Sequence, residues 1–146
     1  MASRLEAFGA TTSSLDDVLA YFDELPPVQV EEMIGDWDGA VVPTGCRGEA
    51  QLGELRWVGK RFNGPDDVDP LMCLDDDGDR SASDVMKRAS LRMVEFRGVV
   101  TATMVYDRHP IFDHFRRVDD DTVLGVMDRR GSVEMVFSLT RRAAPA

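Results

Sequence analysis

The sequence predicts an all-β protein, an antiparallel barrel with short N-terminal helices. Between residues 36 and 140, short runs rich in β-branched and aromatic residues alternate with tight turn clusters. Their spacing of about 10–15 residues is typical of consecutive hairpins. The last run alternates most clearly, since one face carries only apolar side chains and the other only polar ones. These are Val133, Met135, Phe137 and Leu139 against Ser132, Glu134, Ser138 and Thr140.

The N-terminal part predicts helices before the first strand. Residues 1–13 are small and polar, and we expect them to form a loose arm. Ser14 can cap a helix that has acidic residues in its first turn. Pro26 and Pro27 end that helix, and a second short helix over residues 28–33 stops before Gly35. The helical part is therefore predicted to cover residues 14–34.

Turn clusters separate the predicted strands. The strands are expected at 36–42, 52–60, 67–74, 88–96, 99–106, 111–118, 123–128 and 133–140. No internal repeat or change in composition marks a second domain, so residues 14–146 are predicted to form one barrel of about eight to ten strands. The Asp-rich turn 75–79 lacks the spacing of an EF-hand loop, because Gly78 directly follows Asp77 and apolar residues precede Asp75. It is predicted to be a solvated hairpin turn without a metal.

Composition excludes several classes of function. The chain has 146 residues, enough for one core, and a net charge of −10. That charge argues against a nucleic-acid partner and against adsorption to anionic lipid. There is no apolar run of about 18 residues and no N-terminal apolar region of about 7–15 residues. A cytoplasmic protein without integral membrane association is expected, with Cys46 and Cys73 reduced.

The stretch "MIGDWDG" places two glycines and a tryptophan on one face of the first strand. Gly35, Trp37 and Gly39 alternate with two aspartates. If the aspartates face water, Trp37 points inward with open space on each side. We expect Trp37 to be a structural plug at a closed end of the barrel.

A short helix, then Gly-x-Trp in the first strand, then antiparallel hairpins resembles the calycin pattern of lipocalins and fatty-acid-binding proteins. In that superfamily the tryptophan packs at the closed end beneath a basic residue of the last strand. The resemblance implies that Arg141 or Arg142 lies across Trp37, a cation–π contact worth about 0.5–2 kcal/mol. The longer Gly-x-Trp-x-Gly is also similar to the start of nitrobindin-type haem proteins.

The chain most closely resembles the uncharacterised bacterial and fungal family named for its GXWXG motif, whose members carry a second domain of unknown function. The resemblance runs from Leu25 to Asp128. Its motifs are "MIGDWDG", "LRWVGKRF", "VDPLMC", "EFRGVVTATMVYD" and "PIFDHFRRVDDDTVLGVMD". It implies kinship without an established reaction. We expect the two labelled segments to build one barrel, because neither has enough strands to close alone.

Both histidines lie in residues 106–115. Strict alternation puts Asp107, His109 and Asp113 on one face, and Tyr106 and His114 on the other. The histidines are five residues apart and diverge in a regular strand, so no metal site is predicted. Three interpretations stay open: a polar barrel rim, acid–base catalysis with Asp107 or Asp113 orienting His109, and haem ligation by either histidine.

A second candidate centres on Arg92, which shares a face with Val94 and Phe96 in its predicted strand. An arginine among apolar neighbours must pair or face water. It meets either the carboxylate of a lipid-like ligand, with Tyr106 as a hydroxyl donor, or a glutamate at position 54, 95 or 134. Lys60, after Trp57, is a weaker partner. The eight methionines either line an adaptable cavity or fill the core.

The sequence favours a cytoplasmic binding protein for a small hydrophobic or amphipathic ligand, such as a fatty acid, over an enzyme. This hypothesis rests on fold analogy. The alternatives are an enzyme with an Asp/His cluster at 107–114, a haem-binding protein and an interaction module with a filled barrel. No catalytic residue and no cofactor other than haem is put forward, and the oligomeric state stays open. The expected ligand-binding residues are Trp57, Lys60, Arg92, Tyr106, Asp107, His109, Asp113 and His114.

Overall fold

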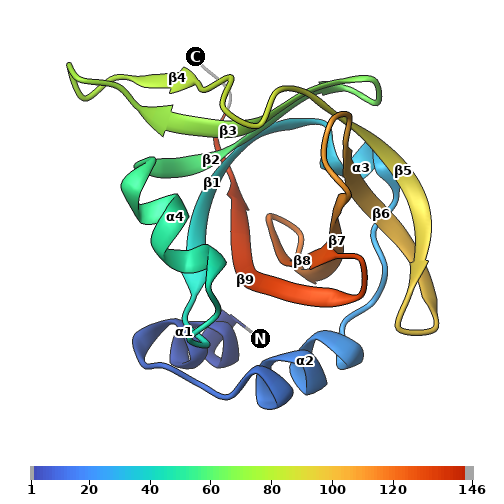
Figure 1. The fold of residues 1–146 in the computed structure, drawn as a ribbon. Helices are drawn as coiled ribbons and strands as arrows, with labels where there is room; N and C mark the ends of the chain where they lie inside the picture. Colours follow the sequence, from blue (N-terminus) through green and yellow to red (C-terminus); the bar gives the residue numbers. More distant parts are fainter. Residues whose placement is uncertain (1, 144–146) are drawn as a thin grey trace.

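A closed antiparallel β-barrel forms the body of the computed structural model, which describes residues 2–143 (Figure 1). The strands follow one another in the sheet as β2-β1-β9-β8-β7-β6-β5-β3-β4, and the additional β2–β3 pairing closes eight of them into a barrel. The ninth, β4, extends β3 outside the barrel. Their bounds are β1 Gly35–Val42, β2 Trp57–Gly64, β3 Asp67–Leu74, β4 Arg80–Ala82, β5 Ala89–Phe96, β6 Val99–Tyr106, β7 Ile111–Asp119, β8 Thr122–Arg129 and β9 Ser132–Arg141. The all-β antiparallel barrel predicted from the sequence is confirmed.

Four helices accompany the barrel: α1 Ala2–Ala10, α2 Leu15–Glu24, α3 Val30–Met33 and α4 Gly48–Glu54. Helix α1 corrects the expectation of a loose N-terminal arm over residues 1–13. Helix α4 corrects the strand expected over 52–60, since β2 begins only at Trp57. The α4 sequence holds alanine, glutamine and two glutamates and no β-branched residue, a composition that favours a helix. Strand β4 was not predicted.

Residues 26–34 cross one end of the barrel and close it. The carbonyl of Pro26 accepts from the amide of Arg117 in β7, and the carbonyl of Val28 accepts from the amide of Ala102 in β6. At the other end of the segment, the carbonyl of Ile34 accepts from the guanidinium of Arg141 in β9. The segment is therefore tied to strands on both sides of the opening.

Trp37 lies buried beneath this closing segment, as the sequence predicts. It is 1% exposed, and its indole N–H donates to the carbonyl of Met33 at 2.9 Å. The guanidinium carbon of Arg141 lies 4.3 Å from its ring centroid, so Arg141 rather than Arg142 makes the expected cation–π contact. Gly35 has a φ of +135°, which only glycine adopts without strain, and a Cβ there would lie 3.4 Å from the Arg141 guanidinium.

Helix α2 covers the outer face of strands β7, β8 and β9 and builds a second apolar layer. Ser14 caps the helix through the amide of Asp17. Its apolar stripe, Val18, Leu19 and Phe22, packs on buried outward-facing side chains of the sheet, which are Val118, Leu124, Val126 and Val136. Figure 1 shows α1 and α2 together on this side. Helix α2 therefore gives the protein a second apolar cluster outside the barrel.

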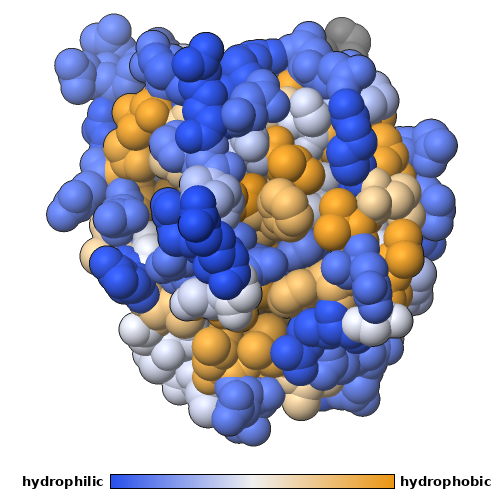
Figure 2. All heavy atoms as spheres, turned by 45° about the vertical axis from the view of Figure 1, so that its right-hand side comes forward, coloured by the Kyte–Doolittle hydropathy of each residue, from blue (hydrophilic) through white to orange (hydrophobic). Residues whose placement is uncertain are grey.

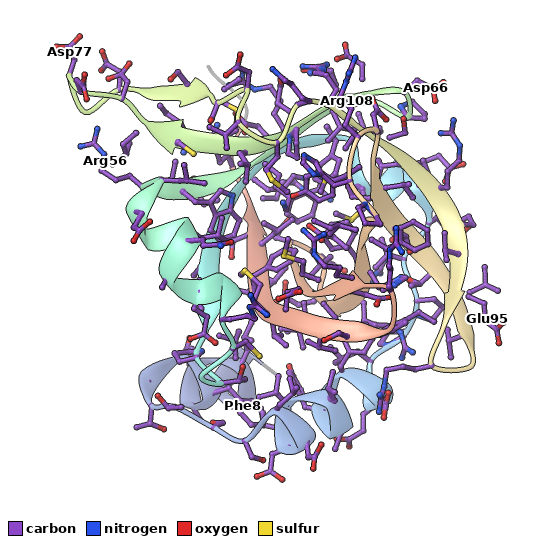
Figure 3. The ribbon with its side chains drawn as sticks, viewed as in Figure 1. Phe8, Arg56, Asp66, Asp77, Glu95 and Arg108 are labelled. Atoms are coloured by element: carbon purple, nitrogen blue, oxygen red, sulfur yellow. The ribbon has the colours of Figure 1, made fainter. Side chains whose placement is uncertain are left out.

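The Asp-rich turn 75–79 lies outside the barrel, and the two cysteines form no disulfide with each other. Asp77, at the tip of the β3–β4 hairpin, projects away from the barrel (Figure 3). The carboxylate of Asp75 accepts from the amides of Asp77 and Asp79, both at 2.9 Å, and so organises the turn. Cys46 and Cys73 are free thiols. Within residues 2–143, no helix has the length and apolar character needed to cross a bilayer.

Candidate functional site

A pocket of about 370 Å³ opens at the end of the barrel opposite the closing segment. Helix α4 forms one wall, and the ends of β3, β6, β8 and the start of β9 form the others. This volume lies in the range of small-molecule sites, roughly 300–1,000 Å³. The pocket is lined by Arg47, Gly48, Gln51, Leu52, Leu55, Leu71, Met86, Tyr106, Met127, Arg129 and Glu134. We call it the mouth pocket.

A second, much smaller cavity of about 20 Å³ lies deeper in the barrel. It shares Leu52, Leu71, Tyr106 and Met127 with the mouth pocket, so these four side chains form a neck between the two spaces. Its other lining residues are Trp57, Lys60, Asp113, Met135 and Phe137. We call it the inner cavity.

Lys60 and Asp113 form an ion pair at the inner cavity. Lys60 Nζ lies 3.2 Å from Asp113 Oδ2 and donates to the carbonyl of Pro70 at 2.9 Å. Lys60 is 3% and Asp113 1% exposed. Burial lowers the pKa of Lys60 and raises that of Asp113, and the attraction within the pair opposes both shifts. Burial thus pushes both groups toward their neutral forms.

Two polar atoms of this site are buried without a hydrogen-bond partner among the described residues. They are Asp113 Oδ1 and Trp57 Nε1, one acceptor and one donor. The Tyr106 side chain lines both spaces, and its pKa is raised well above its ordinary value by burial and then by Asp113, so it stays a neutral hydroxyl. Because a buried unpaired acceptor costs about 1–3 kcal/mol, Asp113 Oδ1 is expected to meet a donor from a bound molecule or water.

A β-bulge brings Trp57 and Lys60 to the same side of β2. Their odd separation places them on opposite faces of a regular strand. The register shifts between Trp57, paired with Cys73, and Gly59, paired with Met72, which inserts one extra residue. The Trp57 ring then fills the space above Gly39 in β1, where a Cβ would lie 2.3 Å from the indole. The second glycine of the motif thus accommodates Trp57 rather than Trp37.

The β6–β7 hairpin brings Tyr106 and Asp113 to the same face, which corrects the assignment made by alternation. Met104 pairs with Asp113 and Val105 with Phe112, and directly paired residues point to the same side of a sheet. Residues 107–110 form an irregular turn, so alternation counted through them does not carry from one strand to the next. Tyr106 and Asp113 face the interior, whereas Phe112 and His114 face outward.

Arg92 and Asp107 lie outside the barrel interior. Arg92 is exposed and pairs with Asp66 at 2.6 Å, not with a glutamate at 54, 95 or 134 as the salt-bridge interpretation expected. Asp66 lies on the β2–β3 turn at the rim (Figure 3). Asp107 is exposed and accepts from the hydroxyl of Ser90 at 3.4 Å. Neither residue lines the mouth pocket or the inner cavity.

The two histidines are also separated from both spaces. His109 is half-buried in the turn, edge-on to the Tyr106 ring with centroids 6.1 Å apart. His114 stacks on Phe96 at 3.9 Å on the outer face, with Nε2 3.1 Å from Asp128 Oδ2 and Nδ1 3.0 Å from Thr103 Oγ1. Asp107, His109 and Asp113 are therefore not brought together, and neither histidine offers an axial haem ligand inside the pocket.

The sequence did not predict most of the mouth pocket, because residues 52–54 of α4 were interpreted as strand and residues 48–51 were assigned to no element. Leu52 and Leu55 are spaced three residues apart in a segment of helix-forming residues, and this signal was available. Two methionines, Met86 and Met127, line the mouth, and Met135 lines the inner cavity. These agree with an adaptable apolar lining.

Comparisons with known proteins identify relatives of the whole chain. The model of the GXWXG protein family matches residues 20–78, and the model of a domain of unknown function, DUF4334, matches residues 87–141. A crystal structure of a protein from Thermomonospora curvata is similar, with a TM-score of 0.89 and 40% identity over 97% of each chain. None of the curated proteins matches. The two matched segments supply β1–β3 and β5–β9, whose pairings β1–β9 and β3–β5 join them in one barrel.

Proposed function

The chain belongs to the GXWXG protein family with its following domain DUF4334, and we propose that it binds a small, mostly apolar molecule carrying one hydrogen-bond-donating group. The molecule occupies the mouth pocket, and its polar group reaches through the neck toward Asp113. This proposal narrows the hydrophobic or amphipathic ligand expected from the sequence. We also propose that the protein binds this molecule in the cytoplasm.

One observation carries the proposal: Asp113 Oδ1 is a buried acceptor without a partner among residues 2–143, and it lines the inner cavity next to the mouth pocket. Buried polar groups of folded proteins are nearly always hydrogen-bonded. A hydrogen bond to a charged group contributes about 1.5–3 kcal/mol, so a hydroxyl, amide or amine on the ligand is favoured at this position. The neck and mouth supply the apolar surface for the rest of the molecule.

The charge at the inner cavity disfavours a carboxylate there. Lys60 is already paired with Asp113, and a second carboxylate would face an unpaired oxygen of the first. Arg92, the residue that the sequence offered for a fatty-acid carboxylate, lies on the outside with Asp66. A neutral head group, such as that of an alcohol or phenol, therefore fits better than a fatty-acid anion.

Titration with 2-naphthol, followed by its fluorescence, tests the proposal. We expect saturable binding, which weakens about tenfold or more in Asp113→Asn and with 2-methoxynaphthalene, because each removes part of the hydrogen bond. Arg92→Ala is the matched control and is expected to bind as the natural chain does. Saturable binding that is equal for 2-naphthol and 2-methoxynaphthalene would refute the head-group assignment. Absence of binding, together with native mass spectra that show no co-purified molecule, would refute the binding function.

A further inference from the structure

Lys60 places a primary amine where the bound molecule ends. Its Nζ lies 5.6 Å from the ring centroid of Trp57, 6.0 Å from that of Tyr106 and 5.2 Å from that of Phe137. Apart from the ion pair, the carbonyl of Pro70 and the nearby Cys73 thiol, its described surroundings are apolar or aromatic. A lysine held in such a cavity is a nucleophile whenever it is neutral. Simple ligand binding does not need this amine.

We propose that Lys60 forms an imine with a small, mostly apolar aldehyde or ketone that enters through the mouth pocket, and that Asp113 moves the protons of this reaction. The inference rests on the proposed function, because the carbonyl compound uses the same pocket. It adds a covalent step and a substrate class, the carbonyl compounds. In this reaction Lys60 supplies the nucleophilic amine, and the carboxyl group of Asp113 transfers the protons.

The reaction balances with the groups present. The Nζ lone pair attacks the carbonyl carbon, and the C=O π electrons move to the oxygen. A proton moves from nitrogen to that oxygen through Asp113, giving a carbinolamine. Asp113 then protonates the hydroxyl, which leaves as water while the nitrogen lone pair forms the C=N bond of an iminium. The remaining N–H proton of the iminium returns to the Asp113 carboxylate, which gives the neutral imine and restores the acid. The amine loses two hydrogens, the carbonyl oxygen leaves with them as water, and no oxidant or reductant is consumed.

The environment brings the reactive protonation state within reach of the ion pair. Burial lowers the pKa of Lys60 and raises that of Asp113. An amine beside a carboxylic acid carries the same number of protons as the ion pair, so the two forms interconvert by one proton shift along the 3.2 Å contact. The amine form supplies the nucleophile, and the acid form supplies the proton that dehydration needs.

Access to Lys60 requires movement of the neck. The inner cavity of about 20 Å³ is too small for a carbonyl compound as it stands. Leu52 and Met127 are only partly buried, and methionine side chains adapt readily to a new neighbour. A shift of these two side chains joins the inner cavity to the mouth pocket.

The chain contains only two lysines, Lys60 and the exposed Lys87, which makes the test direct. The full chain is incubated with 2-naphthaldehyde and sodium cyanoborohydride at neutral pH, and peptide mass mapping locates the reduced adduct. We expect Lys60 to be labelled about tenfold faster than Lys87, because the pocket holds the aldehyde beside its amine. Lys87→Arg keeps this adduct, Lys60→Arg abolishes it, and Asp113→Asn slows it about tenfold or more. Since both lysines are compared within one natural chain, the result does not depend on whether Lys60→Arg folds.

The results of lysine labelling and of 2-naphthol binding together distinguish imine formation from the proposed binding function. Label confined to Lys87 and the N-terminal amine, or equal rates at both lysines, overturns imine formation. If 2-naphthol still binds in that case, the binding function stands alone. If 2-naphthol protects Lys60 from 2-naphthaldehyde, both proposals are supported at one site. Failure of both 2-naphthol binding and Lys60 labelling overturns both. Labelling of Asp113→Asn at the natural rate removes Asp113 from the proton transfers.

Discussion

Lys60 and Asp113 meet inside the barrel from strands on different sides of it, with Nζ 3.2 Å from Oδ2 and both side chains nearly inaccessible to solvent. The tertiary fold alone creates this contact, because the residues lie 53 positions apart in the sequence. Charges buried in this way contribute to stability only as a pair, since each alone keeps its desolvation cost. The first prediction follows from that asymmetry.

Removing one partner of the ion pair is expected to destabilise the fold more than removing both. Asp113→Ala should lower the free energy of unfolding by about 3–5 kcal/mol, while Lys60→Met with Asp113→Leu should lie much closer to the natural chain. Urea unfolding measures both. Arg92→Ala, which breaks the exposed pair with Asp66, is the control and should cost less than about 1 kcal/mol. Equal losses for Asp113→Ala and Arg92→Ala would contradict this prediction.

Arg116 is expected to hold helix α2 on the barrel. Its buried guanidinium donates to the carbonyls of Phe22, in the last turn of the helix, and of the C-cap Leu25 at 3.2 and 2.9 Å, and lies over the Phe22 ring. Arg116→Met removes the donor to the Leu25 carbonyl and leaves the Phe22 carbonyl with only the Leu25 amide, and it should cost about 2–4 kcal/mol. Urea unfolding gives the loss, and hydrogen exchange should show faster exchange of the α2 amides.

The control for the Arg116 prediction is Arg97→Ala, because Arg97 also contacts helix α2. Arg97 makes a paired contact with Asp23 at 2.6 and 2.8 Å, but the pair is largely exposed. Arg97→Ala should therefore lower the free energy of unfolding by less than about 1 kcal/mol. If the two variants were equally stable, the capping role of Arg116 would be wrong.

Gly39 is expected to be intolerant of any side chain because of Trp57. A Cβ at Gly39 would lie 2.3 Å from the indole, so Gly39→Ala must displace the ring and should cost about 1–3 kcal/mol. It should also change the tryptophan emission. Gly64→Ala, where nothing lies within 4 Å, is the matched control and should change stability by less than about 0.5 kcal/mol. Adding Trp57→Leu to Gly39→Ala should recover stability, and a further loss would argue against the clash.

His114 is expected to weaken the fold as the pH falls. Burial lowers its pKa, against the opposing effect of Asp128 and with a smaller lowering by Arg116. Because its folded pKa lies below that of the unfolded chain, the unfolded state binds the proton more readily below a pH of about 6.5. The stabilisation is complete above that pH and is lost as the pH falls through the folded pKa.

Urea unfolding at pH 7.5 and 5.5 compares the natural chain with His114→Gln. The difference in free energy of unfolding between the two should shrink on acidification, because glutamine does not titrate. Carboxylates that do not contact His114 contribute equally to both chains and cancel. A difference that stays constant or grows at the lower pH would show that His114 is not destabilised by protonation.

The outer surface bears on the remaining alternative, an interaction module. Met93, Val100 and Phe112 are the large apolar residues exposed on β5, β6 and β7. Figure 2 shows this side of the molecule, where apolar side chains are interspersed with charged ones. Scattered apolar residues of this kind are normal on protein surfaces.

Local pattern was sufficient for most of the barrel. The alternation in residues 133–140 predicted β9, because adjacent residues in a strand point to opposite faces, a rule that needs no knowledge of the rest of the chain. The same rule predicted that Trp37 points inward, whereas the basic residue across it followed from the resemblance to calycins. The β-rich runs between turn clusters also predicted strands β3, β5, β6, β7 and β8 to within one residue at each end.

The sequence by itself determined the barrel, its closed end and a list of polar residues for the site. Only the tertiary structure decided that Trp57, Lys60, Tyr106 and Asp113 share one cavity, while Arg92, Asp107, His109 and His114 lie outside it. The physical reason is that side chains alternate between the two faces of a strand, so one inserted residue reverses the face of every residue after it. A bulge in β2 and an irregular turn before β7 each change which face a residue occupies, and the pairing with distant strands decides where they occur.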